Sequence, residues 1–421
     1  MKKNYIFPLI IIGLLFFTFG FITWVNGVLI PYFKICLELS NLEALLVAFA
    51  TYISFFLLAL PSSWILKRTG YKKGMIMGLV VMSIGAFTFI PAAHTRTYGL
   101  FLTGIFITAS GMVLIQAAAN PYVAIIGPIE GAAQRIGFMG LANKIAGILA
   151  QTVLGGLLLF NADTILGKIK TNPTIKDQIL DDYALRVVNP YIIIGCVFLV
   201  VAVLVFYSSL PEINEDTNNK SSEKDTKTSV LQFPHLVLGA IALFFAGACE
   251  VIPVDGIILY SKSLGIPLEQ SKHFGSYTLY AMLGGYIATT VLVPKYLNQS
   301  KALILCSIGG LGLTLAAYLS KNFTSVYFLI GTGFITAWLW GTIWGLSLKD
   351  LGRFTKIGSA ILLMALIGGA ITPLVFGWLI DINPLRPQNA VLMLLPCYLI
   401  ILWFARYGSK ISSWKTLRNN R

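Results

Sequence analysis

The chain is a succession of long apolar runs separated by short polar segments. A helix needs roughly 20 apolar residues to cross a bilayer, and twelve runs are long enough. We place the predicted spans at residues 6–33, 44–66, 74–93, 98–126, 136–160, 188–209, 233–261, 273–294, 301–320, 323–348, 357–381 and 388–406. The pattern therefore predicts an all-α membrane protein with twelve transmembrane helices.

The most polar stretch of the chain runs from Pro211 to Ser229 and has no apolar periodicity. Such a composition is typical of a flexible linker. Because it follows the sixth span, it divides the chain into two equal sets of helices. We expect an N-terminal six-helix half over residues 1–210, a cytoplasmic linker over 211–232 and a C-terminal six-helix half over 233–421.

Composition agrees with a membrane protein, since 57% of the residues are hydrophobic and only 11% are charged. The net charge of +14 comes from bases in short loops, without a basic domain, so we expect no nucleic-acid partner. The five cysteines occur singly, which excludes a disulfide framework or a cysteine metal site. No nucleotide-binding loop or nucleophile–base pattern indicates an enzyme or a bound cofactor.

Orientation follows from the lysines and arginines. If the N-terminus is cytoplasmic, about two-thirds of the 31 basic residues fall in cytoplasmic segments, as the positive-inside rule requires. The first apolar run is too long for the core of a signal peptide and is expected to be a span. We therefore predict a multi-pass protein of the cell inner (plasma) membrane, monomeric in the lipid bilayer, with both termini in the cytoplasm.

The two predicted halves resemble each other. GPIEGAAQRIG (127–137) follows span four, and KDLGRFTKIGS (349–359) follows span ten. A weaker pair is LKRTGYKKG (66–74) after span two and VPKYLNQSKA (293–302) after span eight. Repeated halves are typical of secondary transporters, which bind substrate between the halves near the midplane.

Four segments resemble a known family: NGVLIPYFK (26–34), QAAANPYV (116–123), LANKIAG (141–147) and LLMALIGGAITPLVFGWLID (362–381). They are similar to the fucose and glucose/galactose permease branch of the major facilitator superfamily, and the resemblance covers nearly the whole chain. It implies the major facilitator fold and an alternating-access symporter for hexoses such as glucose and galactose.

Two positions depart from the fucose permease pattern. That pattern has Asn-Asp in span one, where this chain has Asn26-Gly27, and an acid in span four, where this chain has Gln116. In that relative the two carboxylates are associated with proton coupling and sugar recognition. Its proton mechanism therefore does not transfer directly to this chain.

Three charged residues lie inside otherwise apolar spans: Lys144, Glu250 and Asp255. An ion in hydrocarbon costs several kcal/mol, so such residues normally face a protein interior or a water-filled path. Pro253 lies between the two acids, and a proline can break a helix and free carbonyl oxygens. We expect Glu250 and Asp255 to couple transport to a cation, either as ligands of Na⁺ or by binding H⁺. A salt bridge to Lys144, or a solvated position near the outer mouth, is the structural alternative.

Lys144 is expected to donate to sugar hydroxyls or to pair with Glu250 or Asp255 across the halves. Its neighbour Asn143 forms a stripe on one helix face with Gly147 and Gln151.

Further amides in the N-terminal half are candidates for sugar binding. Gln116 and Asn120 are four residues apart and share a helix face, and Asn26 lies in span one. An amide offers both a donor and an acceptor, which suits sugar hydroxyls. We expect Asn26, Gln116, Asn120 and Asn143 to contact sugar; hydrogen bonding between helices is the alternative use of the same amides.

Aromatic rings in the C-terminal half are further candidates, because aromatic faces stack on the C–H face of a pyranose. Trp340 shares a face with Trp344 in span ten and matches a tryptophan of the family pattern, and Tyr277 lies in span eight. A lipid-facing or interfacial position is the alternative for Trp340.

The leading hypothesis is a cation-coupled hexose symporter. An uncoupled sugar facilitator is an alternative, because the two acids of the fucose permease pattern are missing. An exporter of another small metabolite would have the same twelve spans.

Overall fold

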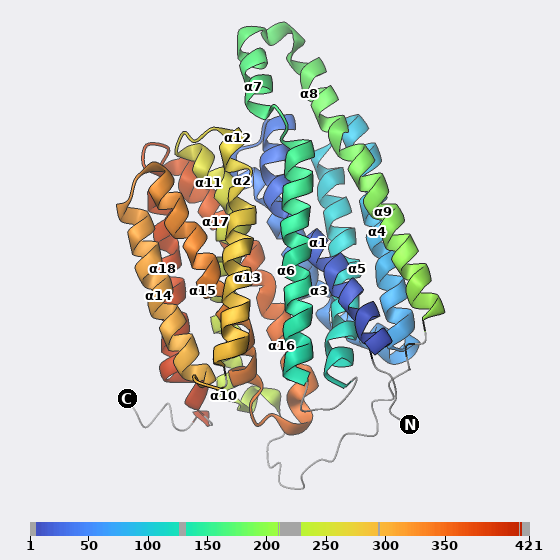
Figure 1. Ribbon diagram of the computed structural model, residues 1–421, viewed down its shortest axis with the longest axis vertical. Helices are drawn as coiled ribbons and strands as arrows, with labels where there is room; N and C mark the ends of the chain where they lie inside the picture. Colours follow the sequence, from blue (N-terminus) through green and yellow to red (C-terminus); the bar gives the residue numbers. More distant parts are fainter. Residues whose placement is uncertain are drawn as a thin grey trace.

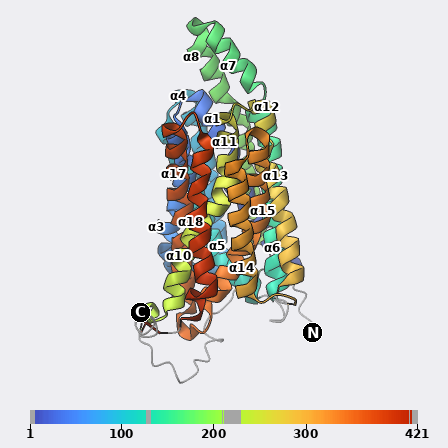
Figure 2. The same cartoon turned by 90° about the vertical axis from the view of Figure 1, so that its left-hand side faces the viewer.

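The structure, a computed structural model, describes residues 6–125, 132–208, 210, 229–293, 295–411 and 413–414. It is an elongated bundle of helices (Figures 1 and 2). The helices of the N-terminal half, coloured blue to green, lie beside those of the C-terminal half, coloured yellow to red (Figure 1). The first helix begins and the last long helix ends at the same end of the bundle, the lower end in Figure 1.

The first half contains six long helical segments: α1 (Ile6–Cys36), α2 (Asn41–Ala44) with α3 (Leu46–Thr69), α4 (Tyr71–Thr95), α5 (Tyr98–Ile125), α6 (Ala132–Leu158) and α9 (Val188–Tyr207).

The second half also contains six long helical segments. Three are built from consecutive pieces: α10 (Pro234–Val251) continues through the π-helical turn η6 (Ile252–Gly256) into α11 (Ile257–Ser263), α16 (Thr355–Met364) continues through η8 (Ala365–Ile367) into α17 (Gly368–Ile382), and η9 (Pro387–Met393) continues into α18 (Leu394–Arg406). The other three are α13 (Phe274–Leu292), which the short α12 (Leu268–Ser271) precedes, α14 (Gln299–Leu319) and α15 (Asn322–Leu348).

These segments coincide with the twelve predicted spans, so the predicted all-helical fold is confirmed. Within the described residues, eleven of them are long and apolar enough to cross a membrane. The exception is α13, whose sequence contains several tyrosines, threonines and glycines in place of branched aliphatic residues. It packs between α6 of the first half and α15 of the second.

The segment at residues 161–187, between the fifth and sixth predicted spans, forms a helical hairpin. Its helices α7 (Ala162–Thr171) and α8 (Lys176–Ala184) project beyond the upper end of the bundle (Figures 1 and 2). The Tyr32 hydroxyl donates a 2.7 Å hydrogen bond to the Ala184 carbonyl, and Arg96 pairs with Asp181 at 2.9 Å. These contacts anchor the base of the hairpin to α1 and to the end of α4.

Most of the predicted linker, residues 211–228, lies outside the described residues. The structure begins again at Ser229, just before a short 3₁₀ turn at Val230–Gln232. The linker and the exact boundary between the two halves therefore stay predictions.

Close packing of α4 against α5 depends on glycines on both helices. A Cβ atom on Gly111 would lie 2.3 Å from the carbonyl oxygen of Gly78. Likewise, a Cβ on Gly85 would lie 2.7 Å from the carbonyl oxygen of Gly104. Small residues at such positions let helix backbones approach closely, which is how helices in lipid gain packing energy.

We expect Gly111→Leu to destabilise the protein by about 1–3 kcal/mol, the usual cost of overpacking a tight contact. Thermal unfolding of the purified protein in detergent should show a lower Tm. Gly312→Leu in α14 is the matched control, since a Cβ there meets nothing within 4 Å. Equal melting temperatures for the two variants would contradict the role given to Gly111.

Candidate functional site

A buried ion pair joins the two halves. The ammonium of Lys144, on α6, lies 3.0 Å from Oε1 of Glu250, on α10. The Lys144 side chain is 4% exposed and that of Glu250 is 21% exposed. Of the two acids predicted as partners of Lys144, the structure therefore pairs it with Glu250. Each half contributes one charge of the pair.

Trp24, on α1, lies at the centre of this cluster and is nearly buried. The Lys144 ammonium lies 3.7 Å from the centre of its ring, a cation–π contact. The indole Nε1 donates a 2.9 Å hydrogen bond to Oδ1 of Asn143, and Nε2 of Gln151 donates to the Trp24 carbonyl at 2.9 Å. A Cβ on Gly147 would lie 2.5 Å from the indole ring.

The predicted stripe of Asn143, Gly147 and Gln151 therefore does share one face of its helix, and that face is directed at Trp24. For Asn143, hydrogen bonding between helices was the alternative to sugar contact, and both Asn143 and Gln151 make such bonds. No motif in the sequence singles out Trp24, although it lies two residues before Asn26 in span one. The available signal was that it is the single tryptophan of that span.

Asp255 is completely buried in the π-helical turn η6. The sequence suggested that Pro253 breaks the helix here; the helix instead continues through the wider π-helical turn. Thr278 Oγ1 donates a 2.8 Å hydrogen bond to the Pro253 carbonyl. Neither carboxylate oxygen of Asp255 has a hydrogen-bond partner among the described residues. A Cβ on Gly27 would lie 3.0 Å from the Val254 carbonyl oxygen, so the absence of a side chain allows α1 to approach η6 closely.

The two acids predicted to couple transport to Na⁺ or H⁺ thus have different surroundings. Glu250 is neutralised by Lys144, whereas Asp255 has no counter-ion bonded to it. No group of three or more His, Cys, Asp or Glu residues that could hold a metal is found in the part of the chain that the structure describes. In this conformation Asp255 is the acid left without a bonded partner.

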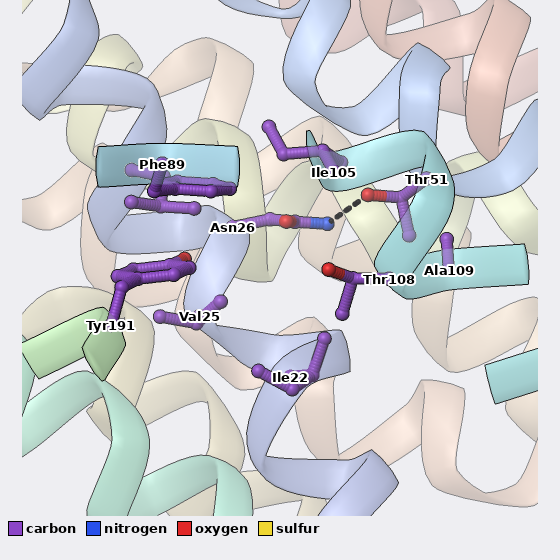
Figure 3. A pocket seen from close by; sticks show the side chains of 10 residues that line it. Ile22, Val25, Asn26, Thr51, Phe89, Ile105, Thr108, Ala109 and Tyr191 are labelled. Carbon is purple, nitrogen blue, oxygen red and sulfur yellow. Dashed lines mark hydrogen bonds between the residues drawn. The ribbon is translucent and has the colours of Figure 1, made fainter. Parts of the chain in front are cut away.

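Asn26 is buried within the first half. Its Nδ2 donates a 3.0 Å hydrogen bond to Thr51 Oγ1. Both residues line a cavity of about 10 Å³, with Thr108 and Tyr191 on other sides (Figure 3). That volume is about the minimum for a single water molecule. In this conformation Asn26 therefore contributes to packing among helices of its own half.

The other predicted sugar-binding residues lie outside the contacts described above. On α5, Gln116 is half-buried and Asn120 is exposed. Tyr277 of α13 is 44% exposed. Its ring contacts those of Phe274 in the same helix and of His273, the residue just before that helix. Trp340 of α15 is half-buried and stacks on Trp344 at 5.3 Å. The structure thus brings together only Asn143 and Lys144 from the predicted sugar-binding set, and adds Glu250.

Two acidic residues connect the halves at the upper end of the bundle in Figure 1. Asp381, at the end of α17, accepts hydrogen bonds from Asn41 Nδ2 at 2.5 Å and from the Leu42 backbone at 2.9 Å. Asp163 of α7 accepts a 3.0 Å bond from the Glu269 backbone and lies 3.6 Å from Lys262. The carboxylates therefore join α2 to α17, and α7 to α11 and α12. These contacts lie at the end of the bundle opposite the one where the first helix begins and the last long helix ends.

Residues 12–373 match the family model described as Major Facilitator Superfamily. A "Glucose/galactose transporter" from Brucella abortus is 33% identical over 413 residues, covering 97% of this chain and 96% of the relative. A "Putative glucose/galactose transporter" from Helicobacter pylori is 29% identical over 400 residues, covering 94% of this chain and 95% of the relative.

A solved structure of the fucose:proton symporter from Escherichia coli is also similar, with a TM-score of 0.74 and 26% identity. The match covers 97% of this chain and 100% of that one. The arrangement of helices in the two proteins is therefore the same over nearly their whole lengths.

We expect Lys144→Met and Glu250→Gln each to lower the free energy of unfolding by about 3–5 kcal/mol, because each change leaves a buried charge without its counter-ion. The double variant should be more stable than either single variant, since it removes both charges. Thermal unfolding of the four proteins in detergent measures this coupling. Strictly additive losses would show that the two residues do not form a pair in the membrane protein.

Proposed function

This chain belongs to the Major Facilitator Superfamily, and we propose that it is a cation-coupled symporter that imports glucose- or galactose-like hexoses by alternating access. It would thus be a membrane transporter and not an enzyme. The nearly full-length similarity to proteins named as glucose/galactose transporters supports the choice of substrate.

The observation that carries the proposal is the buried Lys144–Glu250 pair between the halves. Alternating access requires the halves to separate first on one side and then on the other. Separating a buried ion pair without compensation costs several kcal/mol. A polar ligand bound beside Lys144 and Asn143 can supply replacement hydrogen bonds, so ligand binding and movement of the halves become linked. Sugar contacts by Asn26, Gln116, Asn120, Tyr277 and Trp340 stay predictions.

Asp255 is the proposed site of the coupling cation. A buried carboxylate without a hydrogen-bond partner is costly as an ion, so a bound proton or metal cation would stabilise it. The similar Escherichia coli protein is named a fucose:proton symporter, which favours H⁺. The carbonyl oxygens around the π-helical turn are hard ligands that suit Na⁺. We propose that Asp255 binds one of these cations, and that Glu250 responds to it through Lys144.

Uptake of radiolabelled glucose and galactose into proteoliposomes tests the proposal. We expect an inward gradient of either H⁺ or Na⁺ to drive accumulation above equilibrium, and dissipating that gradient to abolish it. Sugar counterflow without any gradient-driven accumulation would identify an uncoupled facilitator. Absence of hexose counterflow would exclude hexoses as the substrate and favour an exporter of another metabolite.

In the same assay, we expect Asp255→Asn to abolish accumulation while sugar exchange continues, because the amide can no longer bind a coupling cation as a carboxylate does. Asp182→Asn, at an exposed position of α8, is the matched control and should accumulate sugar normally. Unchanged accumulation by Asp255→Asn would place the coupling site elsewhere.

A further inference from the structure

We infer that the indole ring of Trp24 is a stacking surface for the pyranose ring of the transported sugar, and that the Lys144 ammonium covers this surface in the present conformation. The inference rests on the proposed transport of a hexose. It assigns a sugar-binding role to a residue of α1 that is in contact with the ion pair between the halves.

The Trp24 ring is held in place by α6. Three groups of α6 fix Trp24: Asn143 accepts from the indole N–H, Gln151 donates to the backbone carbonyl, and Gly147 leaves room for the ring. The bond from the indole N–H to Asn143 holds the ring in one orientation. Fixing the ring in advance reduces the entropy that a ligand must lose when it binds.

The face of the Trp24 ring that Lys144 occupies also suits a sugar. An aromatic ring has a negative face, which attracts positive charge. The Lys144 ammonium lies 3.7 Å from the centre of that face. The C–H bonds on one face of a pyranose carry partial positive charge and are apolar, so they are attracted to the same surface. Ammonium and sugar are therefore alternative occupants of the Trp24 ring.

Polar groups from both halves lie near the Trp24 ring. Glu250 is 21% exposed and can accept hydrogen bonds from hydroxyl groups. Asn143 is half-buried, and its amide nitrogen is a donor that the bond to Trp24 does not use. Tyr286 of α13 places its ring 5.5 Å from the Lys144 ammonium. Donors and acceptors from both halves thus surround one aromatic face, as sugar recognition requires.

This arrangement gives Lys144 a defined part in the cycle. A sugar that stacks on Trp24 displaces the ammonium from the ring, and the displaced ammonium can donate to a sugar hydroxyl. The geometry of the Lys144–Glu250 pair then changes with sugar occupancy. Binding in the first half is in this way transmitted to an acid of the second half.

Equilibrium binding of radiolabelled glucose and galactose to the purified full-length protein tests the inference. We expect Trp24→Leu to weaken galactose binding by about tenfold or more, and Trp24→Phe, which keeps a ring, by about threefold or less. Galactose should lose more than glucose, because its axial hydroxyl leaves a continuous patch of C–H groups on one face. Trp378→Leu, at a half-exposed tryptophan of α17, is the matched control and should bind normally.

A second measurement uses the wild-type residue. In protein labelled with 5-fluorotryptophan, the ¹⁹F resonance of Trp24, assigned by its absence in Trp24→Phe, should shift when galactose is added. An unshifted resonance at saturating galactose would overturn the inference even if Trp24→Leu does not fold.

Two further results would also overturn it. One is wild-type affinity for both sugars in folded Trp24→Leu. The other is an equal loss in Trp24→Leu and Trp24→Phe, which would assign the effect to the indole N–H bond with Asn143. A wild-type protein that binds no hexose would instead reject the proposed function, and this inference with it, before any variant is compared.

Discussion

The burial of one positive and one negative charge at the boundary between two sets of helices is the constraint on which the rest of this structure depends. Lys144 comes from the first half and Glu250 from the second, so either half alone would bury a charge without compensation. Such a charge is expensive in a protein surrounded by lipid. The two halves are therefore complementary in charge as well as in shape, and Trp24 and Asn143 are organised around the positive member.

The fold could be predicted from the sequence because its main signal is local. In lipid each span must satisfy its own backbone hydrogen bonds as a helix, so a long apolar run is sufficient to place it. The signal is weakest at α13, because its tyrosines, threonines and glycines lower its hydropathy. The α7–α8 hairpin was not predicted, because its short polar helices are held by contacts with Tyr32 and Arg96, which are distant in sequence.

The site was predictable only in part. The free-energy cost of burying a charge in the membrane is enough to identify Lys144, Glu250 and Asp255, because charged side chains are rare at membrane depth unless they have a role there. Helical spacing also predicts correctly that Asn143 and Gln151 share a face. The partner on that face, Trp24, is a property of how two helices pack, and no periodicity within one helix shows it. The choice of Glu250 over Asp255 as the partner of Lys144 depends on packing between the halves in the same way.

The π-helical turn that contains Asp255 has a mechanical consequence. A π turn holds one more residue than an α turn, and it lies within the span that carries Glu250 below and α11 above. If the turn tightened to α-helical geometry, everything on one side of it would rotate by about 100° relative to the other side. The lower part of the span could then keep its ion pair while the upper part changed its contacts with α1. The buried acid thus lies in the turn about which the two parts of the span would rotate, where the presence or absence of one charge can select between π- and α-helical geometry.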